Sequence, residues 1–250
     1  MLLLAAEPVI AMWSDRHGVA TGWFLCALIV ILMLYGVRKR FPHLPLGVAS
    51  GWRKWHTMLG WLAMAAFLLH AGPLPPEGVL DTVLWSLFVS TLQMGAVGVV
   101  LTRVLPKDLD RGGQRQLFER LPGMAWALST RCKTLIDTLP ESPTSAPVVR
   151  YYRLRVLGAL SRPLSWRTRL NERRLKRALA ELQAVQKHLA GATYEVASEV
   201  AQLLVTRTEL ERQYRALYWL RLWVEVHLSL AVAAVLVMLV HILARYGFRL

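Results

Sequence analysis

Residues 55–70 read WHTMLGWLAMAAFLLH, an apolar stretch that contains two histidines, His56 and His70. A second stretch, VHLSLAVAAVLVMLVH at 226–241, repeats this pattern with the same 14-residue spacing between its histidines. Fourteen residues are close to four helical turns, so both histidines of one helix share a face, about 21 Å apart along the axis. The pattern predicts two helices that each carry a histidine near either end of an apolar span.

Four windows of the chain are long and carry at most one charged residue. They are 19–37, 55–79, 82–102 and 222–244. About 20 mostly apolar residues cross the hydrocarbon core of a bilayer, so we predict four transmembrane helices. The predicted fold is all-α: a four-helix transmembrane bundle with a cytoplasmic α-helical hairpin inserted between spans 3 and 4.

The chain is strongly basic, with 30 Lys and Arg against 16 Asp and Glu and a net charge of +14. The excess is concentrated in 105–221, which holds 21 basic and 11 acidic residues. The connection 38–54 carries five basic residues and no acid, whereas the charges of 71–81 are Glu77 and Asp81. The positive-inside rule places the two basic segments in the cytoplasm and both termini outside. We therefore predict a multi-pass protein of the bacterial inner membrane.

A basic excess can also indicate nucleic-acid binding. Here, however, the Lys and Arg residues are spread along predicted helices and match no nucleic-acid-binding motif. They also belong to a segment that is tied to the bilayer at both ends. We therefore expect no nucleic-acid partner, and predict contact with anionic membrane lipids and docking of an acidic redox partner.

The charge pattern divides the chain into three parts. Residues 1–104 contain spans 1–3, residues 105–220 form a cytoplasmic helical domain, and residues 221–250 contain span 4. Within the second part, three prolines in 138–148 predict a linker that follows a shorter helix at 114–137.

A 4-3 spacing of mostly apolar residues predicts long helices packed side by side in the cytoplasmic part. Its members are Leu175, Leu179, Leu182, Gln186, Leu189, Thr193, Val196, Val200, Leu203, Arg207, Leu210, Tyr214 and Leu217. Gly191 interrupts the run, so 168–190 and 194–221 are predicted to form an antiparallel hairpin. Because no Gly or Pro lies between Gly191 and Gly247, the returning arm is predicted to continue unbroken into span 4.

The predicted topology pairs the four histidines of the two apolar stretches. Spans 2 and 4 run in the same direction, so His56 is expected to face His227 near the inner surface. His70 is then expected to face His241 near the outer surface. Two facing imidazoles supply both axial ligands of a six-coordinate haem iron. The four histidines therefore predict two haem sites, stacked across the bilayer.

Residues around the inner histidines are consistent with a macrocycle between the helices. Small residues follow each inner histidine by four and seven positions: Gly60, Ala63, Ala231 and Ala234. Arg53 at the inner edge and Arg245 at the outer edge are candidate partners of haem propionates. Four tryptophans at the inner ends of the two spans are interpreted as an interfacial aromatic belt: Trp52, Trp55, Trp219 and Trp223.

Two plainer interpretations compete with haem ligation. An intramembrane histidine can simply hydrogen-bond a neighbouring helix. Two histidines at one level could also bind zinc, which normally takes further cysteine or carboxylate ligands. Four histidines paired at one spacing on two parallel helices favour a cofactor site over either alternative.

Spans 2 and 4 resemble those of membrane di-haem cytochromes b. This group includes the haem-bearing four-helix core of quinol:cytochrome c reductases and, more loosely, the ferric-reductase-like family. The resemblance rests on the four histidines, their spacing and Gly60, and covers the two stretches directly and the four spans by topology. It implies two non-covalent b-type haems, each held by two histidines, and electron transfer across the membrane. The cytoplasmic hairpin departs from both groups.

The resemblance implies an electron-transfer subunit of an oxidoreductase complex, with no catalytic residue of its own, rather than a complete enzyme. Its partners would be iron–sulfur, flavo- or c-type cytochrome subunits in a hetero-oligomeric complex, with quinone as a further candidate ligand. No residues match a quinone-site signature, and a flavin-reductase domain is missing, so we do not expect this chain alone to oxidise NAD(P)H. Two alternatives stay open: a quinone-reactive or metal-reducing membrane reductase, and a cofactor-free membrane anchor or coiled-coil scaffold.

Overall fold

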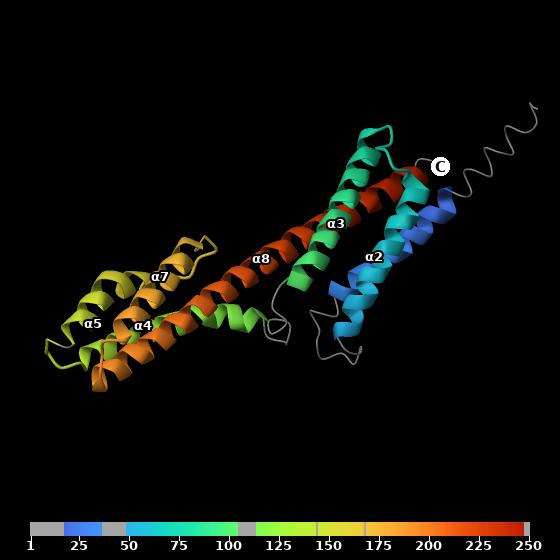
Figure 1. Ribbon diagram of the computed structural model, residues 1–250. Coiled ribbons are helices and arrows are strands. Elements are labelled where there is room, and N and C mark those ends of the chain that lie inside the picture. The colour runs from blue at the N-terminus through green and yellow to red at the C-terminus, as the bar shows by residue number, and fades with distance from the viewer. Residues whose placement is uncertain (1–17, 37–48, 105–113, 144, 168, 248–250) are drawn as a thin grey trace, which may run out of the picture. The chain divides into compact units, whose positions relative to one another are not determined.

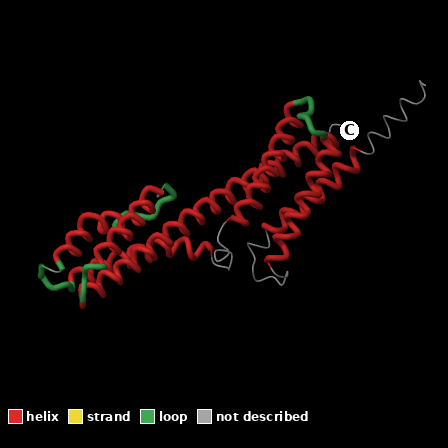
Figure 2. The backbone as a smooth tube through the Cα atoms, in the orientation of Figure 1, coloured by secondary structure: helices red, strands yellow, loops and turns green. Residues whose placement is uncertain are grey.

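The structure is a computed structural model that describes residues 18–36, 49–104, 114–143, 145–167 and 169–247. Every regular element within these residues is a helix, as Figure 2 shows. This confirms the all-α prediction. The basic residues Arg38, Lys39 and Arg40 of the predicted cytoplasmic connection lie outside the described residues.

The helices follow one another along the chain as labelled in Figure 1. A helix at Gly18–Gly36 comes first. It is followed by α2 (Ala49–Ala71), α3 (Val79–Val104), α4 (Gln114–Asp137), α5 (Ala146–Tyr151), the π-helix η2 (Tyr152–Val156), α6 (Leu157–Leu160), α7 (Arg169–Gln186) and α8 (Gly191–Gly247). The predicted helix at 114–137 and the unbroken helix between Gly191 and Gly247 are both confirmed.

The chain forms two compact units, and each is described on its own. Unit 1 comprises Met1–Arg103 and Trp223–Leu250, and unit 2 comprises Val104–Leu222. The long helix α8 therefore contributes its first part to unit 2 and its last part to unit 1.

Three helices of the described residues are long and apolar enough to cross a membrane: Gly18–Gly36, α3 and α8. This indicates a membrane protein. The helix α2 occupies the position of the predicted second span but is not one of these three. Arg53 and Lys54 lie in its first two turns and it carries two histidines, and these polar side chains lower its mean hydropathy.

The helix α2 ends at Ala71, where the predicted connection 71–81 begins. The apolar window itself extends to residue 79, so a local feature must end the helix. Gly72 has a φ of 78°, a left-handed conformation that glycine adopts without a steric penalty. Its N–H donates to the carbonyl of Leu68 at 3.1 Å, which satisfies one of the last helical carbonyls. The left-handed conformation of Gly72 therefore ends α2. The apolar window by itself does not show where this helix stops.

Three helices of unit 1 share one apolar core, and the last part of α8 contacts the first of them. The core joins the first helix, α2 and α3 through the buried residues Leu25, Leu28, Ala63, Ala66, Phe67 and Phe88. Within it the rings of Phe67 and Phe88 stack with centroids 4.3 Å apart. Trp23 Nε1 donates to the hydroxyl of Tyr246 at 3.1 Å, which connects the first helix to α8.

In unit 2, α7 and the first part of α8 pack together with α4, α5, η2 and α6. The buried face of α8 includes the predicted residues Thr193, Val200, Arg207, Leu210 and Leu217. It also takes in Ala197 and Leu204, whereas the predicted Val196 and Leu203 are only partly buried. The reason is that α8 contacts several helices in this unit, which broadens its buried face beyond a two-helix seam.

A buried ion pair lies on this face of α8. Arg207 and Glu211 are 1% and 0% exposed, with Nε and Oε1 3.3 Å apart. Arg207 also donates from Nη2 to the carbonyl of Arg162 at 2.6 Å. Charged groups are buried at this depth only when they are paired and hydrogen-bonded. The predicted stripe included Arg207 but not Glu211. Glu211, its acidic partner, lies one turn further along the same helix.

Candidate functional site

The structure brings His56 of α2 and His227 of α8 together in unit 1. Their ring centroids are 6.5 Å apart and the rings are nearly perpendicular, at 82°. Opposed imidazoles that share a metal ion, with metal–nitrogen bonds of about 2 Å, have ring centres about 6 Å apart. The spacing of this pair therefore fits one metal ion between the two rings.

Two aromatic side chains flank the pair. The ring of Tyr35, at the end of the first helix, lies 5.0 Å from that of His56. The indole of Trp223 stacks on His227 at 5.7 Å with an interplanar angle of 16°. Trp223 Nε1 also donates to the carbonyl of Met94 in α3 at 2.7 Å. The sequence reasoning assigned Trp223 to an interfacial belt and missed that it positions His227.

Two glycines of α3 make room for these α8 side chains. A Cβ atom on Gly98 would lie only 2.0 Å from Cζ2 of Trp223, so no larger residue fits there without displacing the indole. A Cβ atom on Gly95 would lie at an ordinary 3.8 Å from Cε1 of His227. Small residues spaced three or four apart on apolar helices often mark such close approaches, which is the signal that could have found them.

The predicted small residues beside the inner histidines have different surroundings. A Cβ atom on Gly60, one turn after His56, would meet nothing within 4 Å. Ala63 is fully buried in the core of unit 1, Ala234 is 8% exposed, and Ala231 is half-buried. Open space is therefore available beside Gly60, whereas Ala63 already packs against neighbouring helices.

At the other end of unit 1, each outer histidine contacts a different helix through its Nδ1 atom. Nδ1 of His70 lies 3.1 Å from the carbonyl of Gly18 and 3.3 Å from the hydroxyl of Thr21. A Cβ atom on Gly22 would lie 2.9 Å from His70 Cε1, so glycine is what lets the imidazole lie against the first helix. His241 instead donates from Nδ1 to Oδ1 of Asp81 at 2.7 Å.

Two further charged residues, Asp81 and Arg245, lie at the same end of unit 1 as the outer histidines. Arg245 donates from Nη2 to the second carboxylate oxygen of Asp81 at 2.9 Å. Asp81, His241 and Arg245 are all close enough to act electrostatically on His70. Arg245, predicted as a candidate partner of a haem propionate, thus forms an ion pair with the carboxylate of Asp81. Sequence reasoning used Asp81 only as an external charge, whereas it lies in the first turn of α3 and faces α8.

The donor set suits haem iron better than a bare metal ion. The inner pair supplies two imidazole nitrogens, and haem iron needs only these axial ligands because its macrocycle supplies four more nitrogens. A structural zinc ion takes four protein ligands. The geometry of His56 and His227, with open space beside Gly60, is therefore compatible with a bis-histidine haem.

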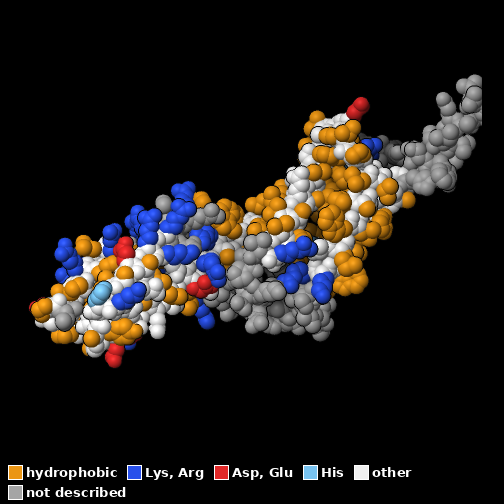
Figure 3. All heavy atoms as spheres, in the orientation of Figure 1, with side chains coloured by type: hydrophobic (Ala, Val, Ile, Leu, Met, Phe, Trp, Pro, Cys, Tyr) orange, Lys and Arg blue, Asp and Glu red, His pale blue; other side chains and the backbone are white. Residues whose placement is uncertain are grey.

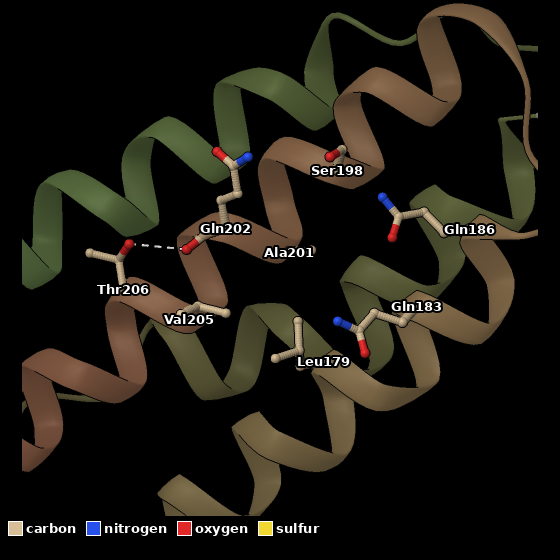
Figure 4. A pocket seen from close by; sticks show the side chains of 8 residues that line it. All are labelled: Leu179, Gln183, Gln186, Ser198, Ala201, Gln202, Val205 and Thr206. Carbon is tan, nitrogen blue, oxygen red and sulfur yellow. Dashed lines mark hydrogen bonds between the residues drawn. The ribbon is translucent and has the colours of Figure 1, made fainter.

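Two other features of unit 2 offer no comparable chemistry. Burial, with a further contribution from Glu199, raises the pKa of Cys132 to about 12, so this thiol is not a nucleophile at neutral pH. A hollow of about 440 Å³ between α7 and α8 is shown in Figure 4. It is lined by Leu179, Gln183, Gln186, Ser198, Ala201, Gln202, Val205 and Thr206. None of these side chains is ionisable, so the hollow suggests no catalytic or metal-binding role.

No protein-family model matches the chain, and no curated protein or solved structure is significantly similar to it.

Proposed function

We propose that the protein is an integral membrane b-type cytochrome that binds two haems and passes electrons across the membrane as a subunit of an oxidoreductase complex. The observation that carries this proposal is the 6.5 Å approach of the His56 and His227 rings from two separate helices. The 14-residue repeat of histidines on both helices supports a second site at the level of His70 and His241.

At the inner site, His56 and His227 would bind the iron, and haem would supply one-electron redox chemistry. Trp223 orients the ring of His227 by stacking on it, and is itself held by the carbonyl of Met94. Gly60 leaves space for the macrocycle beside His56. The role of these residues is to bind and orient the cofactor.

At the outer site, His70 and His241 are the proposed ligands. Each uses Nδ1 in a hydrogen bond, His70 to the first helix and His241 to Asp81. The remaining nitrogen of each ring, Nε2, is therefore the one assigned to iron.

A haem assay of the purified full-length chain tests the proposed function. We expect sharp low-spin b-type bands on reduction with dithionite, and two haems per chain in a pyridine haemochrome assay. Absence of haem would refute the cytochrome and favour the cofactor-free anchor or scaffold. Reduction of both haems by added quinol in the isolated chain would instead favour a quinone-reactive reductase.

The proposed membrane arrangement has four spans: the three most apolar helices and α2. Contacts within unit 1 support alternating directions. Tyr35 at the end of the first helix meets His56 near the start of α2, and Gly18 at the start of the first helix meets His70 near the end of α2. The positive-inside rule then places both termini outside a bacterial inner membrane. In unit 2, α7 and the first part of α8 would form the cytoplasmic hairpin.

We further propose that unit 2 docks an acidic redox partner through its basic surface. Figure 3 shows Lys and Arg side chains gathered over this unit, in contrast to the hydrophobic side chains of α2 and α3. The exposed cations of α5, η2 and α7 that form this surface are Arg150, Arg153, Arg155, Arg173, Arg174, Lys176 and Arg177. Clustered charge of one sign steers an oppositely charged partner and accelerates association.

Charge reversal at Arg173 and Arg177 is expected to slow the physiological reduction or reoxidation of the haems in native membranes. The slowing should be about tenfold at low ionic strength and should shrink as salt is added. Dithionite reduction should be unchanged. The control reverses Lys133 and Lys187, which are exposed elsewhere on unit 2. Equal slowing in both double variants would show that net charge matters and that this surface does not.

A further inference from the structure

Asp81 is the acidic group at the outer histidines, and both of its carboxylate oxygens are used. Oδ1 accepts from Nδ1 of His241 at 2.7 Å, and Oδ2 accepts from Nη2 of Arg245 at 2.9 Å. His241 and Arg245 are four residues apart on α8, so they present one face of the helix to the first turn of α3. With each oxygen occupied, the orientation of the carboxylate is set by two bonds.

The hydrogen bond to Asp81 sets the tautomer of a neutral His241 ring. A carboxylate oxygen only accepts, so the shared proton must lie on Nδ1 of the imidazole. The lone pair of the neutral ring is then on Nε2, on the opposite side from Asp81. The side chains of His241 and Asp81 are 21% and 22% exposed, so solvent competes little for this bond.

We propose that Asp81 is the positioning residue of the outer haem, an inference that rests on the proposed function. Its carboxylate holds His241 in the Nδ1–H tautomer, orients Nε2 for iron and makes the imidazole a stronger electron donor. Hydrogen bonds from a ligating histidine to a carboxylate have these effects in metalloproteins generally. Arg245 balances the charge of the carboxylate and keeps it in place.

The inner ligand has different surroundings, which makes the two sites unequal. The ring of His227 stacks on the indole of Trp223, and among the described residues its buried Nδ1 has no hydrogen-bond partner. An imidazole that donates no hydrogen bond to a carboxylate is a weaker electron donor to a metal. A stronger donor favours ferric iron, so the contact with Asp81 lowers the midpoint potential of the outer haem relative to the inner one.

The test is a redox titration and an electron paramagnetic resonance spectrum of the haem-loaded full-length Asp81→Asn variant. The affected haem is identified as the one that is lost in His241→Ala. We expect its midpoint potential to rise, its low-spin resonance to shift and its affinity for the site to fall roughly 10- to 100-fold. The inner haem should keep its potential and resonance.

Two matched variants separate positioning from charge. Glu77→Gln removes the same charge from an exposed residue four positions earlier and should change neither haem. Asp81→Glu keeps a carboxylate and should restore part of the outer affinity and potential. An equal shift in Glu77→Gln, or an unchanged outer haem in Asp81→Asn, would overturn the inference while leaving the cytochrome intact.

Arg245→Gln provides a second test if the Asp81→Asn chain does not accumulate. This change keeps the bond between Asp81 and His241 but removes one of the two bonds that hold the carboxylate, so the outer haem should remain bound with smaller shifts in potential and resonance than in Asp81→Asn. Loss of that haem in Arg245→Gln would overturn the inference, because it would mean that the ion pair and not the imidazole bond holds the site. Absence of haem from the wild-type chain would refute the proposed function itself.

Discussion

Replacing His227 with alanine is expected to lower the haem content of the chain from two to one. The side chain that faces it, His56, would be left as a single axial ligand, and a b-type haem has no covalent bond to retain it. His56→Ala should give the same result, because both rings contribute to one centre at 6.5 Å. The pyridine haemochrome assay measures the loss, and the remaining haem should keep its low-spin spectrum.

A change that leaves both ligands in place provides a sharper form of this test. Gly60→Leu fills space in which a Cβ atom meets nothing within 4 Å, so the helix should fold as before and only the inner haem should be excluded. His188→Ala removes an exposed histidine of unit 2 and should leave two haems. If His227→Ala or Gly60→Leu also retained two haems per chain, iron would not lie between His56 and His227.

Gly98→Ala is expected to displace the indole of Trp223 and to weaken the inner site. The new methyl group would lie 2.0 Å from Cζ2 of Trp223, so the indole must move. Its hydrogen bond to Met94 and its stack on His227 would both be disturbed. Overpacking of this kind costs about 1–3 kcal/mol. We expect a lower unfolding temperature in detergent and reduced occupancy of the inner haem.

Gly95→Ala is the matched control for this change. It adds the same methyl group to the same helix three residues earlier, at an ordinary contact distance of 3.8 Å from His227. Stability and haem content should therefore stay near those of the wild type. Trp223→Phe should keep an aromatic ring beside His227 but remove the hydrogen bond to Met94. Identical melting and haem content in Gly98→Ala and Gly95→Ala would contradict a positioning role for Trp223.

The helices that were predicted correctly are those with strong local signals. The helix α4 matches its predicted range, and α8 runs unbroken because it contains no proline and no internal glycine. The segment from α5 to α6 was not predicted, because it follows a proline-rich linker and consists of short helices, including the π-helix η2. Its buried residues, such as Val148 and Val156, are stabilised by contacts with other helices rather than by a long periodic pattern.

In the candidate site, too, local spacing was predictable and contacts between helices were not. Spacing predicted that His56 and His70 share a face of α2, and that His227 and His241 share a face of α8. It also placed Gly60 one helical turn after His56, the inner histidine of α2. Spacing could not show that the outer rings each meet another helix, because Gly18 and Asp81 are distant in sequence from the histidines that they contact.

The sequence by itself determined the helical class of the protein and which histidines lie on one helix face, because 3.6 residues per turn is a property of the backbone. Only the tertiary structure decided which group each imidazole meets. The rotation and separation of two helices depend on how side chains from different helices interlock, as Trp223 does against the bare backbone of Gly98. That packing brings His227 to His56 and sets His241 against Asp81.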